Sequence, residues 1–173
     1  HIFTDEATQT VICRDFDRPE FSILQNSGKI VIKTEDITFC FDLAKGKTES
    51  ITLKDGRIVT DFKTGNLKGT YRTLDMANGA VKLGDGLMST NGVSVVDDSK
   101  TVIICADGTM KARRHVQKDG YYFAFGNDYG GCLQDFFKLC GAVPLVPRFC
   151  LGNWWSRYKD YSQQEYIDLM KEF

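Results

Sequence analysis

The segment Ile37–Leu43, with the sequence ITFCFDL, decides the fold class of this chain. Its large apolar residues Ile37, Phe39 and Phe41 alternate with smaller or polar ones, which is the period of a β-strand with one buried face. An amphipathic helix would instead repeat its apolar residues every three or four positions. We therefore expect a strand here, with three large side chains facing a core.

Turn sequences on both sides extend this pattern. Three turn sequences are each flanked by two apolar segments. Asn26-Ser27-Gly28 lies between Phe21–Leu24 and Lys29–Lys33, and Asp55-Gly56 lies between Ile51–Leu53 and Arg57–Val59. Asp107-Gly108 lies between Thr101–Cys105 and Met110–Val116. The glycine of each turn tolerates the positive φ that a tight hairpin requires. Short strands without a helical interruption, from Phe21 to about Phe125, predict an antiparallel β-sandwich.

The pattern changes after Phe125. Asp128 can cap a helix with apolar residues at helical spacing, and Gly141 is placed to end it. The segment Arg148–Tyr158 is apolar on both faces, as in a strand buried in a parallel sheet. Ser162 and Glu165 form a capping box for a second, amphipathic helix. A βα unit of this kind needs parallel neighbours, so we expect a longer parent protein.

Composition limits the function. The chain has 173 residues, 42% of them hydrophobic, and a formal net charge of −1. We expect a globular protein that neither binds nucleic acid nor spans a membrane. Six scattered cysteines without a C-x-x-C pair lack the spacing of a zinc or redox site. We expect buried free thiols, because several of them lie inside apolar strand patterns. With no signal peptide at the start of the sequence, we expect a cytoplasmic location. The chain begins at His1 without a methionine, so we expect residues to precede it.

Several separated motifs resemble the glycoside hydrolases of family 31, in particular their bacterial α-glucosidase-like members. The motifs are GNLKGTYRTLD at Gly65–Asp75, DGLMS at Asp85–Ser89, VDDS at Val96–Ser99, GNDY at Gly126–Tyr129, PRFCLGNWWSRY at Pro147–Tyr158 and TQTVICRDF at Thr8–Phe16. They are long, keep the family's order and cover nearly the whole chain.

The resemblance implies a galactose-mutarotase-like β-sandwich over 1–125, a helical linker over 126–146, and the start of a (β/α)₈ catalytic barrel over 147–173. Arg148–Tyr158 would be the first barrel strand and Ser162–Phe173 the first helix. Family members are retaining α-glycosidases with an Asp nucleophile and an Asp acid/base. Both lie on later barrel strands, so this chain alone is expected to be inactive, with no catalytic residue and no cofactor.

The resemblance also implies three substrate-binding residues. Tyr158 matches the aromatic beside the non-reducing sugar, although a tyrosine after two tryptophans can equally be core packing. Arg157 either keeps site carboxylates ionised or forms a structural ion pair. Asp75 lies in the loop 63–98 that the family's sandwich sends over the barrel mouth, or it caps a turn. We assign Trp154 and Trp155 to packing.

The predicted function is hydrolysis of α-glucosides from the non-reducing end by the parent protein, with an oligosaccharide and the rest of the barrel as partners. One alternative is a stand-alone carbohydrate-binding or structural sandwich. Another is a family member specific for α-xylosides, N-acetylgalactosaminides or sulfoquinovosides.

Asp97 and Asp98 are adjacent and diverge on an extended chain, so we predict a turn role for them, and we place His115 on the surface. The sequence leaves open whether the protein is a homo-oligomer.

Overall fold

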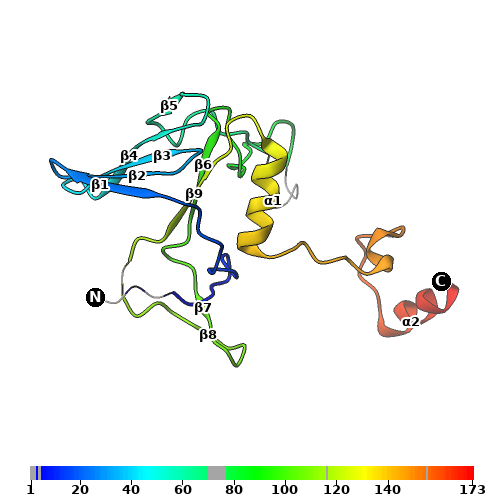
Figure 1. Cartoon of the computed structure of the whole chain (residues 1–173). Helices are drawn as coiled ribbons and strands as arrows, with labels where there is room; N and C mark the ends of the chain where they lie inside the picture. Colours follow the sequence, from blue (N-terminus) through cyan, green and yellow to red (C-terminus); the bar gives the residue numbers. More distant parts are fainter. Residues whose placement is uncertain (1–2, 4, 70–76, 116, 155) are drawn as a thin grey trace. The chain divides into compact units, whose positions relative to one another are not determined.

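The computed structural model describes residues 3, 5–69, 77–115, 117–154 and 156–173 of the chain (Figure 1). The chain divides into two compact units, His1–Ala142 and Val143–Phe173. We describe each of them by itself.

The first unit contains a five-stranded antiparallel sheet in which sequence order is spatial order. Its strands are β1 (Ser22–Asn26), β2 (Lys29–Lys33), β3 (Thr38–Asp42), β4 (Lys47–Thr52) and β5 (Ile58–Val59). Ser27 and Gly28, between β1 and β2, both have positive φ (49° and 78°), as a type I′ hairpin turn requires. Gly56, between β4 and β5, has a φ of 86°. The predicted hairpins in this region are confirmed.

Two further antiparallel pairs of strands lie among the described residues of this unit. The pairs join β6 (Val93–Asp97) to β9 (Gly120–Ala124) and β7 (Ile103–Ile104) to β8 (Met110–Lys111). β6 lies inside the segment 63–98 that we predicted to be one long irregular loop, so that prediction was wrong for its last part. The sequence missed β6 because its partner β9 begins more than 20 residues later along the chain.

A small apolar core joins the five-stranded sheet to the β6–β9 pair. Ile51, Leu53, Val59 and Val93 are buried together, with Phe39, Phe62 and Ala124 packed against them. The cluster packs strands β3 to β5 of the five-stranded sheet against the separate two-stranded sheet of β6 and β9. The structure is therefore mainly antiparallel sheet, and it is consistent with the predicted β-sandwich.

The helix predicted after Asp128 is confirmed as α1 (Tyr129–Cys140). Asp128 accepts a hydrogen bond from Gly131 N at 2.9 Å, and Gly141 ends the helix with a φ of 88°. The carbonyl oxygen of Leu139, in the last turn, accepts bonds from Ile12 N and Cys13 N at 3.1 and 3.0 Å. The early segment of the chain thus satisfies an otherwise open carbonyl of α1.

Among the described residues of the second unit, none forms the strand predicted over Arg148–Tyr158. Its described residues form a short 3₁₀ helix, η1 (Arg148–Leu151), followed by irregular structure. Local bonds satisfy the backbone here, from Cys150 N to the Pro147 carbonyl at 2.9 Å and from Gly152 N to the Phe149 carbonyl at 3.2 Å. A parallel strand would need hydrogen-bond partners on neighbouring strands, and the described part of this unit supplies none.

The capping box of the second helix is confirmed. In α2 (Gln163–Glu172), the Ser162 side chain accepts from Glu165 N, and the Glu165 carboxylate accepts from Ser162 N at 2.9 Å. Neither η1 nor α2 contains a buried residue. The apolar stripe predicted for this helix is therefore largely exposed.

Two further features bear on the sequence predictions. All six cysteines are free thiols, but Cys132 alone among them is buried, and Cys13 is exposed. Among the helices of the described chain, none has the length and apolar character needed to cross a bilayer.

Candidate functional site

Tyr158 and Arg157 lie in the irregular segment between η1 and α2. The Tyr158 side chain is fully exposed, at 108% of its reference area, and Arg157 is exposed as well. Among the ion pairs of the described residues, none involves Arg157. Both side chains are therefore accessible to a ligand. Their role in sugar binding stays a prediction.

Trp154, four positions before Tyr158, is also largely exposed, at 69%. Its indole nitrogen donates a hydrogen bond to the Cys150 carbonyl at 3.0 Å, which fixes the side chain against η1. The packing role predicted for it is thus limited here to this local contact. Trp155 lies outside the described residues.

Asp75 also lies outside the described residues. The described residues at the base of its loop make specific contacts with one another. The Asn66 side-chain amide bonds Gly86 twice, accepting from its N–H at 2.8 Å and donating to its carbonyl at 2.9 Å. A Cβ at Gly86 would overlap the Leu67 carbonyl oxygen, so only glycine fits. Asn66 also bridges to Ser89. We call this contact the Asn66–Gly86 clamp.

A second pair of contacts continues the clamp toward the loop. The Lys68 ammonium pairs with the Asp85 carboxylate, and Gly69 N donates to the Gly84 carbonyl at 3.4 Å. The two arms of the loop therefore run side by side on either side of residues 70–83. The motifs at Gly65–Asp75 and Asp85–Ser89 were visible in the sequence, but the contact between Asn66 and Gly86 was not.

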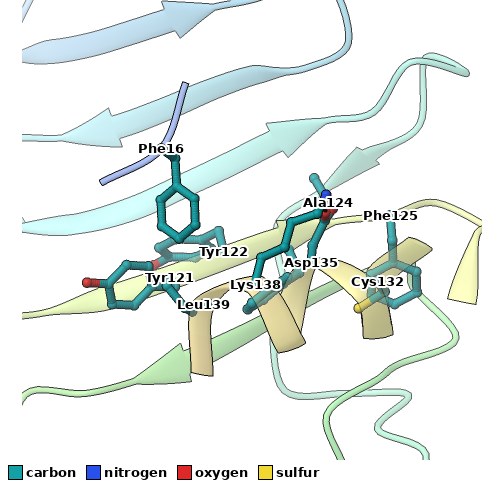
Figure 2. Close-up of a pocket in the computed structure, with 10 residues that line it drawn as sticks. Phe16, Tyr121, Tyr122, Ala124, Phe125, Cys132, Asp135, Lys138 and Leu139 are labelled. Atoms are coloured by element: carbon teal, nitrogen blue, oxygen red, sulfur yellow. Dashed lines mark hydrogen bonds and ion pairs between the residues drawn. The ribbon is translucent and has the colours of Figure 1, made fainter. Parts of the chain in front are cut away.

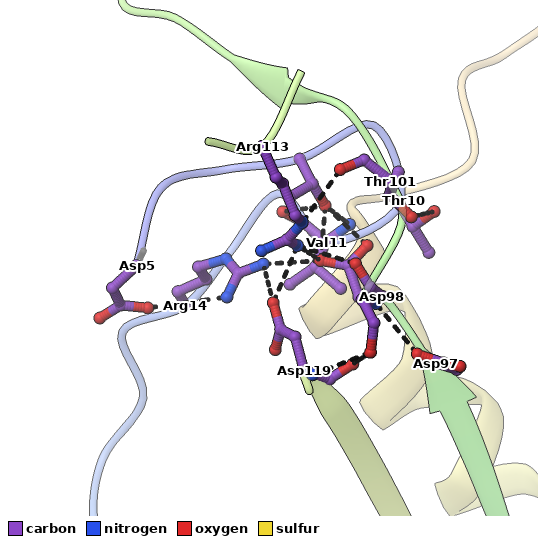
Figure 3. Close-up of polar contacts among 11 residues, drawn as sticks. Asp5, Thr10, Val11, Arg14, Asp97, Asp98, Thr101, Arg113 and Asp119 are labelled. Carbon is purple, nitrogen blue, oxygen red and sulfur yellow. Dashed lines mark hydrogen bonds and ion pairs between the residues drawn. The ribbon is translucent and has the colours of Figure 1, made fainter. Parts of the chain in front are cut away.

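A buried ionic cluster is the densest polar feature of the first unit (Figure 3). Arg14 and Arg113 point toward Asp98, at 2.6 and 2.9 Å, and both also reach Asp119 at 2.9 Å. Thr8 donates to the Asp98 carboxylate at 2.9 Å. Burial works to lower the pKa of Arg14, but its hydrogen bond to Asp119 and the nearby negative charges outweigh this and raise the pKa.

Both members of the aspartate pair make turn hydrogen bonds, as predicted, but their side chains differ in surroundings. Asp97 accepts from Ser99 N at 3.0 Å, as a turn residue does. Asp98 is completely buried in the ionic cluster, and its carbonyl oxygen also accepts a hydrogen bond from Thr101 N at 3.3 Å, which closes a turn over Asp98–Thr101. The sequence missed the cluster because its members are up to 105 residues apart. With Asp98 held by two arginines and Asp97 in a turn, the pair cannot act as catalytic acid and base. His115 is exposed, as predicted.

A hollow of about 300 Å³ lies beside α1 (Figure 2). Phe16 and Tyr121 stand at one side of it, and Cys132 on α1 stands at the other. Burial raises the pKa of the Cys132 thiol, so this sulfur stays protonated and is a poor nucleophile. Asp135, at the rim, is the partner of Lys138 at 2.7 Å. The hollow therefore lacks an activated group for catalysis.

The described residues, taken together, hold no group of three or more His, Cys, Asp or Glu side chains arranged to bind a metal ion. They include exposed aromatic and basic side chains before α2 and the Asn66–Gly86 clamp.

No family model matches this chain. A stretch of 95 residues is 26% identical to an alpha-xylosidase of Saccharolobus solfataricus, and the match covers 50% of this chain and 12% of that enzyme. The chain thus corresponds to a small part of the length of this relative.

Proposed function

We propose that this chain is the N-terminal portion of a glycoside hydrolase of family 31, a retaining enzyme that cleaves α-glycosidic bonds at the non-reducing end. The similarity to an alpha-xylosidase is the observation that carries the proposal at the level of a glycosidase. The mainly antiparallel sheet structure of the first unit supports it. The family motifs at Gly65–Asp75 and Pro147–Tyr158 favour α-glucosides as substrates, and the relative's name keeps α-xylosides as the alternative.

The sugar site in this proposal receives Tyr158, Arg157 and Asp75 from the chain. An exposed tyrosine ring suits the apolar C–H face of a pyranose, and a carboxylate can accept two sugar hydroxyl protons. The Asn66–Gly86 clamp would act as a positioning device, because it fixes both arms of the loop that carries Asp75. The nucleophile and the acid/base would come from other parts of the parent protein.

The start of the catalytic barrel is the second element of the proposal. The unit Val143–Phe173 exposes large apolar side chains along its whole length, including Leu145 at 99%, Leu151 at 76% and Phe173 at 77%. Isolated exposed apolar residues are ordinary, but a continuous series in a unit without a buried residue in η1 or α2 marks an interface. Later barrel strands would cover it and would supply the hydrogen bonds that Arg148–Tyr158 needs to become a strand.

The test compares the longer protein encoded by the same reading frame with the chain alone. Both are assayed against p-nitrophenyl α-glucoside, α-xyloside and α-galactoside. We expect the longer protein to hydrolyse one of the first two and the chain alone to hydrolyse none. Tyr158→Ala should raise KM for that substrate about tenfold or more, and Tyr158→Phe should raise it much less, because the ring is kept. Activity of residues 1–173 alone, or an unchanged KM in Tyr158→Ala, contradicts the proposal.

A second candidate function is a carbohydrate-binding or scaffolding sandwich that acts without hydrolysis. The observation in its favour is that His1–Ala142 is a compact unit with its own apolar core. Under this alternative the longer protein binds the glycosides but releases no p-nitrophenol. A cytoplasmic location in a bacterium accompanies both proposals, and the six free thiols support it.

A further inference from the structure

A groove of about 560 Å³ opens between the two layers of the sandwich. Phe41 and Thr48 line one side, and Val95 and Tyr122 line the other. The core cluster lies further along the same strands, where β4 supplies Ile51 and β6 supplies Val93. The groove is thus the open end of the sandwich interior, and its volume is in the range of small-molecule sites.

The groove is open because one position on its floor has no side chain. Gly120, at the start of β9, is paired with Asp97 and lines the groove. A Cβ built there would meet only the Val96 carbonyl oxygen, at 3.8 Å. Val95 and Tyr122 lie on the strand faces turned to the other sheet, yet each remains 37% exposed. A larger residue at position 120 would fill this space.

The aromatic wall of the groove is fixed before any ligand binds. The Tyr122 ring stands edge-on to Phe39 and Phe62, with centroid distances of 5.3 and 5.5 Å. Thr48 donates a hydrogen bond to the Tyr122 hydroxyl oxygen at 2.7 Å. The hydroxyl proton of Tyr122 is therefore still available for donation, and the exposed part of the ring is held in one orientation.

Hydrogen-bond donors and acceptors both line the groove beside its aromatic rings. Lys118 donates to the Gly46 carbonyl at 2.7 Å and has further N–H groups to donate. Asp97 supplies an acceptor, and its hydrogen bond with Ser99 lowers its pKa, so it is ionised at neutral pH. Lys47 stands at the same mouth.

We infer that this groove of the first unit binds a sugar ring of an α-linked oligosaccharide, through residues other than Tyr158, Arg157 and Asp75. A pyranose has an apolar C–H face that packs on aromatic rings, and its hydroxyls need donors and acceptors at the edge of that face. A wholly apolar ligand would remove Asp97 and Lys118 from water without replacing their hydrogen bonds. The choice of a sugar as the ligand class rests on the proposed function.

The experiment titrates maltotriose into the ¹⁵N-labelled chain and follows the backbone amide shifts. We expect saturable shifts at Gly46, Val95 and Gly120. Gly120→Leu should weaken binding about tenfold or more because its side chain occupies the groove, and Lys118→Ala should weaken it several-fold. Lys54→Ala is the matched control, because this exposed lysine pairs with Asp36 away from the groove, and it should leave the affinity unchanged.

Three results would overturn the inference: shifts that do not saturate, full binding by both groove variants, or groove shifts that depend on protein concentration without sugar. The last result would identify a second copy of the chain as the occupant. The Lys118→Ala variant keeps the test decisive if Gly120→Leu does not fold. Hydrolysis by the longer protein with an empty groove refutes only this inference, and groove binding without hydrolysis refutes only the proposed enzyme.

Discussion

At the scale of single residues, Asp98 is the point where distant parts of the first unit meet. Its carboxylate is completely buried and receives hydrogen bonds from Thr8, Arg14 and Arg113. Two buried guanidinium groups near one another are tolerable only while Asp98 and Asp119 neutralise them. The cluster therefore joins the early segment of the chain to the strands more tightly than surface ion pairs could.

Asp98→Ala is expected to lower the free energy of unfolding by about 3–5 kcal/mol, because it leaves buried positive charge uncompensated. Asp97→Ala, next to it, removes only the turn bond to Ser99 and should cost about 1 kcal/mol. Urea unfolding followed by circular dichroism measures both changes. Similar costs for the two variants would mean that the cluster contributes little to stability.

At the scale of elements, the first turn of α1 contains two adjacent glycines with different surroundings. A methyl group at Gly130 would meet open space, apart from an Asp128 oxygen at 3.7 Å. A Cβ at Gly131 would instead overlap the Asp128 carboxylate that caps the helix.

Gly130→Ala should therefore raise the free energy of unfolding by about 0.5–1 kcal/mol, since alanine loses less backbone entropy than glycine in a helix. Gly131→Ala should give no such gain, or a loss, because the capping side chain must move. The same urea titrations compare the pair, and equal gains in both variants would contradict the capping geometry.

The capping box of α2 makes the start of that helix sensitive to acid. Hydrogen bonds from the Ser162 backbone and side chain, and the charge of Lys159, hold the pKa of Glu165 below its ordinary value of 4.5. A lowered pKa means that the ionised form stabilises the folded helix above the ordinary value, and that this contribution is lost as the pH falls through the folded pKa.

We expect the amide shifts of the first turn of α2 to move toward coil values as the pH falls through the lowered pKa of Glu165, which lies below the ordinary value of 4.5. In Glu165→Gln the neutral side chain can still accept the Ser162 N–H bond, so the same shifts should vary less with pH. A pH titration monitored by NMR measures both. An unchanged titration curve in the variant would exclude Glu165 as the group responsible.

At the scale of the whole molecule, the two units differ in how their apolar side chains are held. Phe149, Trp154 and Tyr158 are exposed at 73%, 69% and 108% in a segment with little regular structure. Phe21 and Leu24 are also exposed, at 53% and 66%, but Leu24 lies in β1, which is hydrogen-bonded to β2. A protease needs an extended, locally unfolded substrate, so exposure alone does not decide cleavage.

Limited digestion with chymotrypsin should therefore cut first within 149–158 and leave a resistant fragment that contains the sheets and α1. Mass spectrometry of the early products tests this expectation, with the exposed residues of β1 as the internal control. Early cleavage after Leu24 at a comparable rate would show that the five-stranded sheet opens as easily as the segment before α2.

The sequence by itself determined the features that depend on a few neighbouring residues. The turn at Ser27-Gly28, the Asp128 cap and the Ser162–Glu165 box were all predictable, because backbone sterics and hydrogen bonds within three or four positions decide them.

Only the tertiary structure decided the pairing of β6 with β9, the burial of Asp98 and the helical form of Arg148–Leu151. Each depends on partners distant in sequence: a strand needs a neighbour for its hydrogen bonds, and a buried carboxylate needs opposite charge brought to it. Where that neighbour is present, as for Val93–Asp97, a segment predicted as loop becomes a strand. Where the described unit offers none, as for Arg148–Tyr158, a segment with strand-like residues keeps local bonds instead.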